Sequence, residues 1–405
     1  MNRLLAHSTK RDEQVMEPLV EPAAALSPAE QARYARHTEL QGFGLTAQLR
    51  MKNARVLVIG AGGLGSAIVP YLAAAGVGVL GIVDDDVVDL SNLQRQVMHS
   101  VATIGMAKTE SAKQHVQGLN PHVEVVTHRL RLTAGNALEI LRGYDLVLDG
   151  ADNFATRYLV SDAAEILGIP CVWGSILQFE GQLSVFWRGH GPTYRDVFPE
   201  PPEPGEVPSC AQAGVLGVLP GQIGSLMAAE AIKLITGIGT PLLGRLMLFD
   251  ALHTRWREMR VMADPDRPAV QALMADYPAF CGLPQASSQV ARLTLEDFAA
   301  SLVRTEPAHR RLVDVRQAQE AQMGMIDGAE LLPLPELLQL SRAEQILERL
   351  PGLREHDPVV LYCQSGQRAM AAAAHLHKLG FKQVQVLEGN VAAWQAYKAA
   401  HAEGT

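Results

Sequence analysis

The stretch VLVIGAGGLGSAIVPYLAAAGVGVLGIV, residues 56–83, runs for 28 positions without a charged side chain. A single apolar helix of that length could cross a bilayer, but seven glycines and Pro70 break the stretch into short pieces. We therefore interpret it as a buried strand, a glycine turn, a helix and a second strand, and we expect no membrane association. A βαβ unit of this kind sets the fold of the chain around it.

The same alternation continues beyond this unit. Strands are predicted at 123–128, 144–150 and 170–175, and helices near 107–118, 134–142 and 156–167. This order is typical of an α/β fold with a Rossmann-like, doubly wound parallel sheet. The segments GQLSVFW (181–187) and LMLFDALHTRWREMRVM (246–262) are expected to form strands that pair antiparallel.

Composition divides the 405 residues into four parts. Residues 1–26 are expected to be a flexible tail, because a helix starts at Ser27, where Pro28 and Glu30 complete the signals of a capped N-terminus. The first α/β domain is predicted over 27–262 and a linker over 263–288. A second, smaller α/β domain of about 115 residues is predicted over 289–405.

Charge and cysteine usage exclude several classes of protein. The net charge of −8 and the pI of about 5.9 argue against a nucleic-acid partner. The four cysteines are widely spaced and form no CxxC pair, which suits a reducing cytoplasm. No apolar stretch at the N-terminus is long enough for a signal peptide, so we expect a cytoplasmic protein.

The glycine turn fits a nucleotide-binding loop. Gly60, Gly62 and Gly65 match G-x-G-x-x-G, and Gly63 is an additional glycine. Such a turn lets backbone amides and a helix N-terminus approach phosphate oxygens. Asp84 stands 19 residues after Gly65, at the end of the next strand, where a carboxylate can bind ribose hydroxyls. Taken alone, this pattern also fits an NAD-dependent enzyme.

The polar decapeptide VVDLSNLQRQ, residues 87–96, points to a different reaction. A hydride-transferring enzyme leaves its cofactor's phosphates intact and has little need for extra cations near them. Cleavage of ATP at the α-phosphate accumulates charge that cations and a metal must stabilise. Arg95, Lys108 and a Mg²⁺ ion held by Asp152 could meet that charge, with Asn92 orienting phosphate oxygens.

The ordered set of motifs resembles the adenylyltransferases of the ubiquitin-activating-like superfamily, in particular the molybdopterin-synthase and thiamine-biosynthesis sulfur-carrier activators. The resemblance covers about 28–262 and is carried by GAGGLG (60–65), DDDVVDLSNLQRQ (84–96), GMAKTESA (105–112), LDGADN (148–153) and SCAQAGVLGVLPGQIGSLMAAEAIKLI (209–235). It implies adenylation of the C-terminal glycine of a small ubiquitin-like sulfur-carrier protein that ends in Gly-Gly. By the same resemblance, Gly62 belongs to the phosphate loop, Asp84 to the ribose site, Asn92, Arg95 and Lys108 to the triphosphate site, and Asp152 to Mg²⁺. Arg36 matches an arginine that is delivered across a homodimer interface to the partner's ATP.

Two departures from the family pattern concern cysteines. Many relatives bind a structural zinc through two CxxC pairs, whereas this chain has Thr193, Asp196, Pro278 and Cys281 at those positions. One thiolate cannot form a tetrahedral zinc site, so no structural zinc is expected and another support for the 189–209 loop is needed. Cys210 matches a cysteine that takes part in thioester or disulfide chemistry with the carrier, and we assign it that role.

The C-terminal domain carries a second cysteine motif. In YCQSGQRA (362–369), Cys363 follows an apolar strand, and the loop from it ends at Arg368 before a helix. Backbone amides and a helix N-terminus stabilise a sulfur anion in such a loop. The C-x₄-R spacing is one residue shorter than the C-x₅-R of cysteine phosphatases, which suits a persulfide better than a phosphate.

With LVDVR (312–316), MIDGAELLPLPEL (325–337) and LEGNVAAW (387–394), this loop is similar to that of rhodanese domains over about 290–400. The resemblance makes Cys363 the sulfur carrier and gives Asp314 and Arg316 structural roles. A persulfide donor such as a cysteine desulfurase would load Cys363.

Together the two domains predict ATP-dependent adenylation of a carrier protein followed by sulfur transfer to give a thiocarboxylate. Two alternatives stay open: an NAD-dependent oxidoreductase with an appended rhodanese domain, and a non-catalytic partner-binding module that keeps the fold. The sequence leaves the pathway of the carrier open among molybdopterin, thiamine, tRNA thiolation, cysteine and siderophore synthesis.

Overall fold

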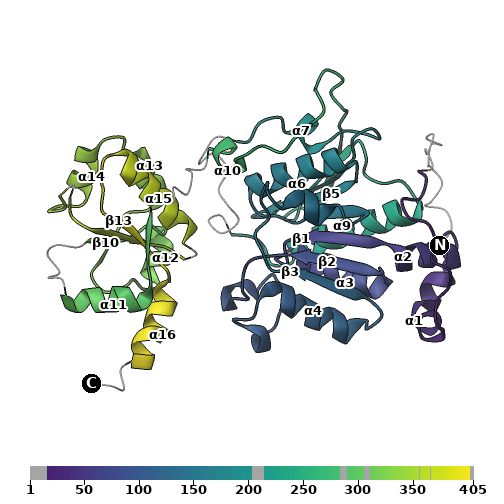
Figure 1. Cartoon of the computed structure of the whole chain (residues 1–405), viewed down its shortest axis with the longest axis horizontal. Helices are drawn as coiled ribbons and strands as arrows, with labels where there is room; N and C mark the ends of the chain where they lie inside the picture. The colour runs from purple at the N-terminus through teal and green to yellow at the C-terminus, as the bar shows by residue number, and fades with distance from the viewer. Residues whose placement is uncertain are drawn as a thin grey trace. The chain divides into compact units, whose positions relative to one another are not determined.

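The structure, a computed structural model, describes residues 16–202, 214–282, 290–304, 311–354, 356–364 and 366–401. The chain folds into two compact units, of which the first reaches Tyr277 and the second runs from Pro278 onward. Figure 1 shows the elements of both units. In the described ranges no helix combines the length and the apolar character that a bilayer span requires.

The first unit is built on one eight-stranded sheet. Its strands are β1 (Arg55–Ile59), β2 (Val79–Val83), β3 (Glu124–His128), β4 (Leu146–Asp149), β5 (Cys171–Leu177), β6 (Glu180–Phe186), β7 (Arg245–Asp250) and β8 (Arg255–Arg260). They lie in the order β3-β2-β1-β4-β5-β6-β7-β8. The first five are parallel, and β6, β7 and β8 pair antiparallel in succession. Both the doubly wound sheet and its antiparallel extension are therefore confirmed.

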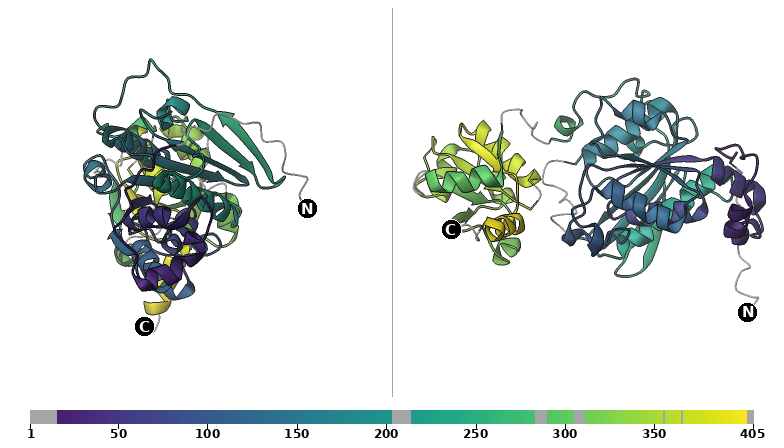
Figure 2. Two further views of the ribbon diagram at one scale, coloured as in Figure 1. Left: turned by 90° about the vertical axis from the view of Figure 1, so that its right-hand side faces the viewer. Right: turned by 60° about the horizontal axis from the view of Figure 1, so that its bottom comes forward.

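Helices cover both faces of this sheet (Figures 1 and 2). On one face, α3 (Gly65–Ala75) packs between α4 (Lys108–Leu119) and α9 (Leu219–Thr236), and on the other, α5 (Ala137–Leu141) packs beside α6 (Phe154–Leu167). The strands in the middle of the sheet are mostly apolar, as in VLVI of β1, because both of their faces are buried. The core between sheet and helices is made of fully buried aliphatic side chains such as Leu72, Leu80 and Leu146.

Two further helices, α1 (Pro28–Thr38) and α2 (Gly44–Asn53), precede β1. The predicted capping box is confirmed: Ser27 Oγ accepts from the Glu30 amide, and the Glu30 carboxylate accepts from the Ser27 amide at 2.7 Å. The same carboxylate accepts from Lys52 Nζ at 2.7 Å and so ties α1 to α2. Burial raises the pKa of Glu30, but the Lys52 and Ser27 bonds outweigh it and lower this pKa to about 2.

The second unit is a smaller α/β layer structure. Its parallel sheet has the order β11-β10-β12-β13-β9 and comprises β9 (Ala291–Leu293), β10 (Arg311–Asp314), β11 (Ala329–Leu331), β12 (Val359–Tyr362) and β13 (Val384–Leu387). The helices are α11 (Leu295–Arg304), α12 (Ala318–Gln322), α13 (Leu334–Gln339), α14 (Ala343–Arg349), α15 (Gln367–Lys378) and α16 (Val391–His401). The predicted boundaries of the tail, the two domains and the linker stay predictions.

Candidate active sites

The glycine turn lies where β1 and β4 run side by side and the sheet changes winding direction, which is where open α/β sheets bind ligands. Gly60 has φ +91°, and a Cβ there would lie 3.2 Å from the Gly150 carbonyl oxygen. A Cβ on Gly65 would meet Gly60 O at 2.2 Å. Glycine is thus required at both positions, and the loops after β1 and β4 touch.

Within the described residues, the amides of Gly62 and Gly63 donate to no protein acceptor. They stand just before α3, whose N-terminus adds a partial positive charge. Three buried side-chain oxygens in this neighbourhood of the chain also lack a partner: Ser66 Oγ, Gln96 Oε1 and Thr109 Oγ1. Gln96 reaches the loop itself, since its Nε2 lies 3.6 Å from where a Gly62 Cβ would be. The unpaired amides and the Ser66 and Thr109 hydroxyls can donate to a polyanionic ligand such as ATP, whereas Gln96 Oε1 can only accept.

Asp84, predicted for the ribose, is held by backbone amides. Its Oδ2 accepts from the Ala61 amide and its Oδ1 from the Asp86 amide, both at 2.8 Å. Burial raises the pKa of Asp84, and the nearby Lys108 charge opposes that rise. The carboxylate therefore lies directly beside the glycine loop, as predicted from its position after β2.

Lys108 begins α4, and its side chain is only 7% exposed. Its Nζ donates to Asp86 Oδ2 at 2.8 Å, but Asp86 itself is 70% exposed. A buried ammonium with a solvent-exposed partner can exchange that partner for a phosphate at little cost in desolvation. Lys108 and Asp84 are thus brought together on the edge of the sheet that carries the glycine loop.

The decapeptide 87–96 forms a compact polar turn. It contains the 3₁₀ turn Leu90–Asn92, which Asp89 caps through its bond from the Ser91 amide at 2.8 Å. Asn92 Oδ1 accepts from the Asp89 amide at 3.3 Å, and Arg95 is half-buried, with Nη1 3.2 Å from Ser91 O. No contact joins Arg95 to Lys108 in the described residues, so their cooperation at a triphosphate stays a prediction.

Two different carboxylates lie at the carboxyl end of β4, Asp149 as its last residue and Asp152 in the loop that follows. Asp149 is buried, accepts from the Ala151 amide at 2.9 Å, and has a pKa that burial raises to about 6 against the opposing Arg157 charge. Asp152 is exposed, and its Oδ1 has one neighbouring donor, Asn153 Nδ2, at 3.4 Å. A free, exposed carboxylate beside a phosphate loop has the oxygen chemistry that Mg²⁺ prefers.

Arg36 does not join this site within one chain. Its side chain is 94% exposed on α1, where Nη1 lies 3.3 Å from Glu39 Oε2. Beside it, a groove of about 420 Å³ is lined by His37 of α1, Tyr71 and Ala74 of α3, and Ala228 and Ile232 of α9.

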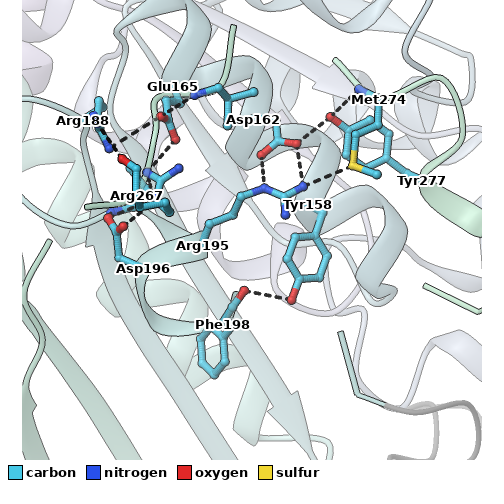
Figure 3. Close-up of polar contacts among 12 residues, drawn as sticks. Tyr158, Asp162, Glu165, Arg188, Arg195, Asp196, Phe198, Arg267, Met274 and Tyr277 are labelled. Carbon is cyan, nitrogen blue, oxygen red and sulfur yellow. Dashed lines mark hydrogen bonds and ion pairs between the residues drawn. The ribbon is translucent and has the colours of Figure 1, made fainter. Parts of the chain in front are cut away.

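Of the four positions compared with zinc cysteines, Thr193 and Asp196 belong to a polar cluster around Arg267, and Figure 3 shows the Asp196–Arg267 ion pair. Thr193 Oγ1 and Asp196 Oδ1 accept from the Arg267 guanidinium at 2.9 and 2.5 Å. The same guanidinium donates to Glu165 Oε2 at 3.0 Å on α6, and Arg188 lies 3.8 Å from that carboxylate. Asp196 and Glu165 are almost fully buried, so the pairs are shielded from solvent. This cluster supports the chain around Thr193. The sequence predicts that the 189–209 loop needs a support other than zinc.

A second group extends the cluster along α6 (Figure 3). Arg195 donates to both oxygens of Asp162 at 2.6 and 2.9 Å, and Tyr277 donates to Asp162 Oδ2 at 2.7 Å. Burial and this bond raise the pKa of Tyr277. We call the two groups together the arginine clamp: Asp162, Glu165, Arg188, Thr193, Arg195, Asp196, Arg267 and Tyr277. The absence of zinc itself remains a prediction.

The second unit has its own site at Cys363, directly after β12. Its Sγ accepts from the Gly366 amide at 3.1 Å, and Gly366, with φ +82°, precedes the 12-residue helix α15. Arg368 closes the loop and forms a bidentate pair with Glu320 at 2.6 and 2.8 Å. Asp314 and Arg316 form another bidentate pair that is almost fully buried. An amide donor and a helix N-terminus aimed at one sulfur fit an anionic sulfur group.

The remaining cysteine prediction falls outside the structure, because Cys210 does not belong to the described residues. Cys171 is buried in β5, and burial raises the pKa of its thiol well above its ordinary value. That thiol is therefore a core group. Sequence reasoning missed His99, Ser66 and Asp149 near the glycine loop, because no local pattern distinguishes them from core residues.

Family models match both units. Residues 34–269 match the ThiF family, and residues 294–397 match the rhodanese-like domain.

Relatives with known names span most of the chain. A probable adenylyltransferase/sulfurtransferase, MoeZ from Mycobacterium tuberculosis, is 49% identical over 93% of this chain and 96% of its own. The sulfur carrier protein adenylyltransferase of Thermus thermophilus is 52% identical over 62% of this chain and 96% of its own. The adenylyltransferase and sulfurtransferase MOCS3 of Drosophila yakuba is 40% identical over 90% and 82%.

Among solved structures, E. coli MccB crystallised with ATP has a TM-score of 0.53 at 21% identity. The match covers 59% of this chain and 74% of that one. At this identity the likeness bears on the fold alone.

Proposed function

The chain belongs to the ThiF family and carries a rhodanese-like domain behind its adenylation domain, and from this premise we propose that it acts on a small ubiquitin-like sulfur-carrier protein ending in Gly-Gly. It is an adenylyltransferase and a sulfurtransferase, as relatives with the same two domains are named. The proposed product is a carrier whose C-terminal carboxylate has become a thiocarboxylate.

In the first stage, a carboxylate oxygen of the carrier attacks the α-phosphorus of ATP, and pyrophosphate leaves. The free amides of Gly62 and Gly63 support phosphate binding in the loop, and Asp84 is positioned for the ribose. Arg95 and Lys108 are assigned to the charge that builds up on the phosphates. The single observation that carries this assignment is the buried Lys108 ammonium beside the glycine loop, whose only ion-pair partner among the described residues is the exposed Asp86.

Asp152 is the proposed Mg²⁺ ligand, because it is exposed and offers carboxylate oxygens next to that loop. A bound Mg²⁺ ion would offset negative charge on the phosphates. The exposed position of Asp152 suits a residue that binds metal together with its nucleotide substrate.

In the second stage, the terminal sulfur of a Cys363 persulfide attacks the acyl carbon, and AMP leaves. The carrier is then joined to Cys363 through an acyl disulfide. We assign Cys210 to the release step: its thiolate attacks the Cys363 sulfur, the thiocarboxylate departs, and a Cys210–Cys363 disulfide forms. An external dithiol reduces that disulfide, and a persulfide donor such as a cysteine desulfurase reloads Cys363.

A homodimer is part of the proposal. The apolar groove between α1, α3 and α9 exposes Tyr71 to 60%, and an exposed apolar surface of this kind is typical of one that another chain covers. Arg36 stands next to this groove and contacts no residue of its own glycine loop within the described chain. Delivery of Arg36 to the partner's ATP accounts for both features.

The test is exchange of labelled pyrophosphate into ATP by the full chain. We expect exchange that depends on a carrier ending in Gly-Gly and on Mg²⁺, and no binding of NAD at the concentration of ATP used. NAD binding without exchange would instead support the oxidoreductase alternative. A chain that binds the carrier but neither nucleotide would support the partner-binding module.

A further inference from the structure

His99 is buried behind the glycine loop, with 6% of its surface exposed. Its Nε2 lies 2.8 Å from the Ala61 carbonyl oxygen, and its Nδ1 lies 2.8 Å from Ser111 Oγ. Ala61 belongs to the loop itself, between Gly60 and Gly62, and Ser111 lies in the first turns of α4. The imidazole therefore bridges the phosphate loop and the helix that begins with Lys108.

The two contacts fix the state of the ring. A carbonyl oxygen only accepts, so Nε2 carries a proton and donates to Ala61. Burial lowers the pKa of His99, and the charge of Lys108 lowers it further. The ring is then neutral at pH 7. Its Nδ1 lies 2.8 Å from Ser111 Oγ, whose hydroxyl also reaches Thr103 Oγ1 at 3.0 Å. With both nitrogens in contact with protein oxygens and only 6% of its surface exposed, His99 is not placed to exchange protons with a substrate.

The bond to Ala61 determines where the next amide points. In a trans peptide the carbonyl of one residue and the N–H of the next face opposite ways. With Ala61 O drawn toward His99, the Gly62 N–H is turned away from the imidazole. The preceding peptide is fixed as well, because the Ala61 amide donates to Asp84. Glycines on both sides of Ala61 would otherwise let these peptide planes rotate easily.

We propose that His99 is a positioning residue that holds the Ala61–Gly62 peptide with the Gly62 amide directed at the phosphates of ATP. The inference rests on the proposed use of ATP and adds a residue outside the motifs of the loop. The free amide of Gly62 and the unpartnered Ser66 hydroxyl are donors around the loop that a phosphate would satisfy. Through Ser111, the same imidazole keeps α4, and so Lys108, in register with that amide.

Two substitutions of similar polarity separate this role from simple packing. In His99→Gln the amide nitrogen can occupy the place of Nε2 and still donate to Ala61. In His99→Asn it reaches only the place of Nδ1, so the Ala61 bond is lost. The dissociation constants of ATP and of adenosine are measured for both variants and for the parent chain, together with their thermal unfolding and carrier-dependent pyrophosphate exchange.

Loss of one hydrogen bond that orders a ligand-binding group weakens binding by about tenfold at most. We expect His99→Asn to bind ATP about tenfold more weakly, His99→Gln to stay within about threefold of the parent, and adenosine to bind all three equally. Equal ATP affinities for the two variants, or a parallel loss of adenosine binding, would overturn the inference. The proposed function would still stand in that case if the parent chain catalyses carrier-dependent pyrophosphate exchange. A parent chain that neither binds ATP nor supports exchange would end both.

Discussion

Arg267 Nε donates to Asp196 Oδ1 at 2.5 Å, although the two residues stand 71 positions apart. This pair joins the segment after β8 to the segment after β6. Arg267 Nη2 and the Val270 amide also donate to the Glu165 carboxylate on α6, at 3.0 and 2.9 Å. The N-terminus of α6 follows Asp152 directly. The arginine clamp thus supports the helix that leads from the proposed metal ligand.

The first prediction concerns Arg267→Met. Removing Arg267 leaves the buried Asp196 and Glu165 carboxylates without their nearest cation, although Arg188 at 3.8 Å and nearby amide and hydroxyl donors remain. Breaking a buried ion pair typically costs about 3–5 kcal/mol, so calorimetry of the full chain should show the unfolding of the first unit about 6–20 °C lower. Arg257→Met, on the exposed strand β8, is the matched control and should change little.

Chelator treatment distinguishes stabilisation by the arginine clamp from stabilisation by a bound zinc ion. Prolonged dialysis against a zinc chelator is expected to leave the unfolding temperature of the parent unchanged. Stoichiometric zinc in the purified chain, together with a fall in unfolding temperature after its removal, would contradict this account of the clamp.

The second prediction concerns Asp149 and pH. Its folded-state pKa of about 6 lies above the ordinary 3.8, so the folded chain binds this proton more tightly than the unfolded chain. Its relative contribution to stability is therefore greatest below about pH 4 and declines as the pH rises to about 6. Asp149→Asn can still accept from the Ala151 amide but does not titrate.

The free energy of unfolding of Asp149→Asn, minus that of the parent, should therefore rise between pH 4 and 7 by about 3 kcal/mol at most. Denaturant unfolding at several pH values measures it. A difference that stays flat over this range would mean that Asp149 titrates normally.

The third prediction separates the two activities. Cys363→Ser removes the sulfur that Gly366 stabilises, and we expect it to abolish sulfur transfer while pyrophosphate exchange stays within about twofold of the parent, because the two chemistries use different groups. Cys171→Ala should keep both activities, since the buried Cys171 thiol is not ionised. Loss of exchange in folded Cys363→Ser would show that the units do not act separately.

The fourth prediction tests the assignment of Arg36 to the partner's site. Arg36→Ala and Lys108→Ala should each be inactive in exchange. In a mixed dimer, one of the two sites pairs an intact Lys108 with an intact Arg36. Random mixing of the variants should therefore restore about a quarter of the parental exchange, because half of the dimers are mixed and each has one working site. No recovery on mixing, or full activity of Arg36→Ala alone, would contradict delivery across an interface.

Local sequence patterns predicted the βαβ unit and the parallel sheet, because apolar runs, glycine turns and the alternation of strands with helices are visible in the sequence itself. The uncharged apolar run of 56–83 has to be buried, and its glycines indicate a turn. Alternation of strands with helices predicts a parallel sheet, whose ligand site lies where β1 and β4 run side by side and the winding direction changes. Asp84 and Lys108 lie near that site because Asp84 directly follows the carboxyl end of β2 and Lys108 begins α4.

The rest depends on contacts between distant residues. His99 meets Ala61 across 38 positions, and Arg267 meets Asp196 across 71. Each side chain alone has the pattern of an ordinary core or surface residue, and only the packing of whole elements brings the partners together. The raised pKa of Asp149 likewise comes from its burial at the end of β4, which no local pattern reveals.

The most direct test of adenylation followed by thiolation is the mass of the carrier itself. The full chain is incubated with ATP, Mg²⁺, a carrier ending in Gly-Gly, a persulfide donor and a dithiol. We expect an increase corresponding to one oxygen replaced by one sulfur, no change with Lys108→Ala, and AMP addition without sulfur in Cys363→Ser. A carrier that gains sulfur equally well without ATP, or with Lys108→Ala, would contradict the account.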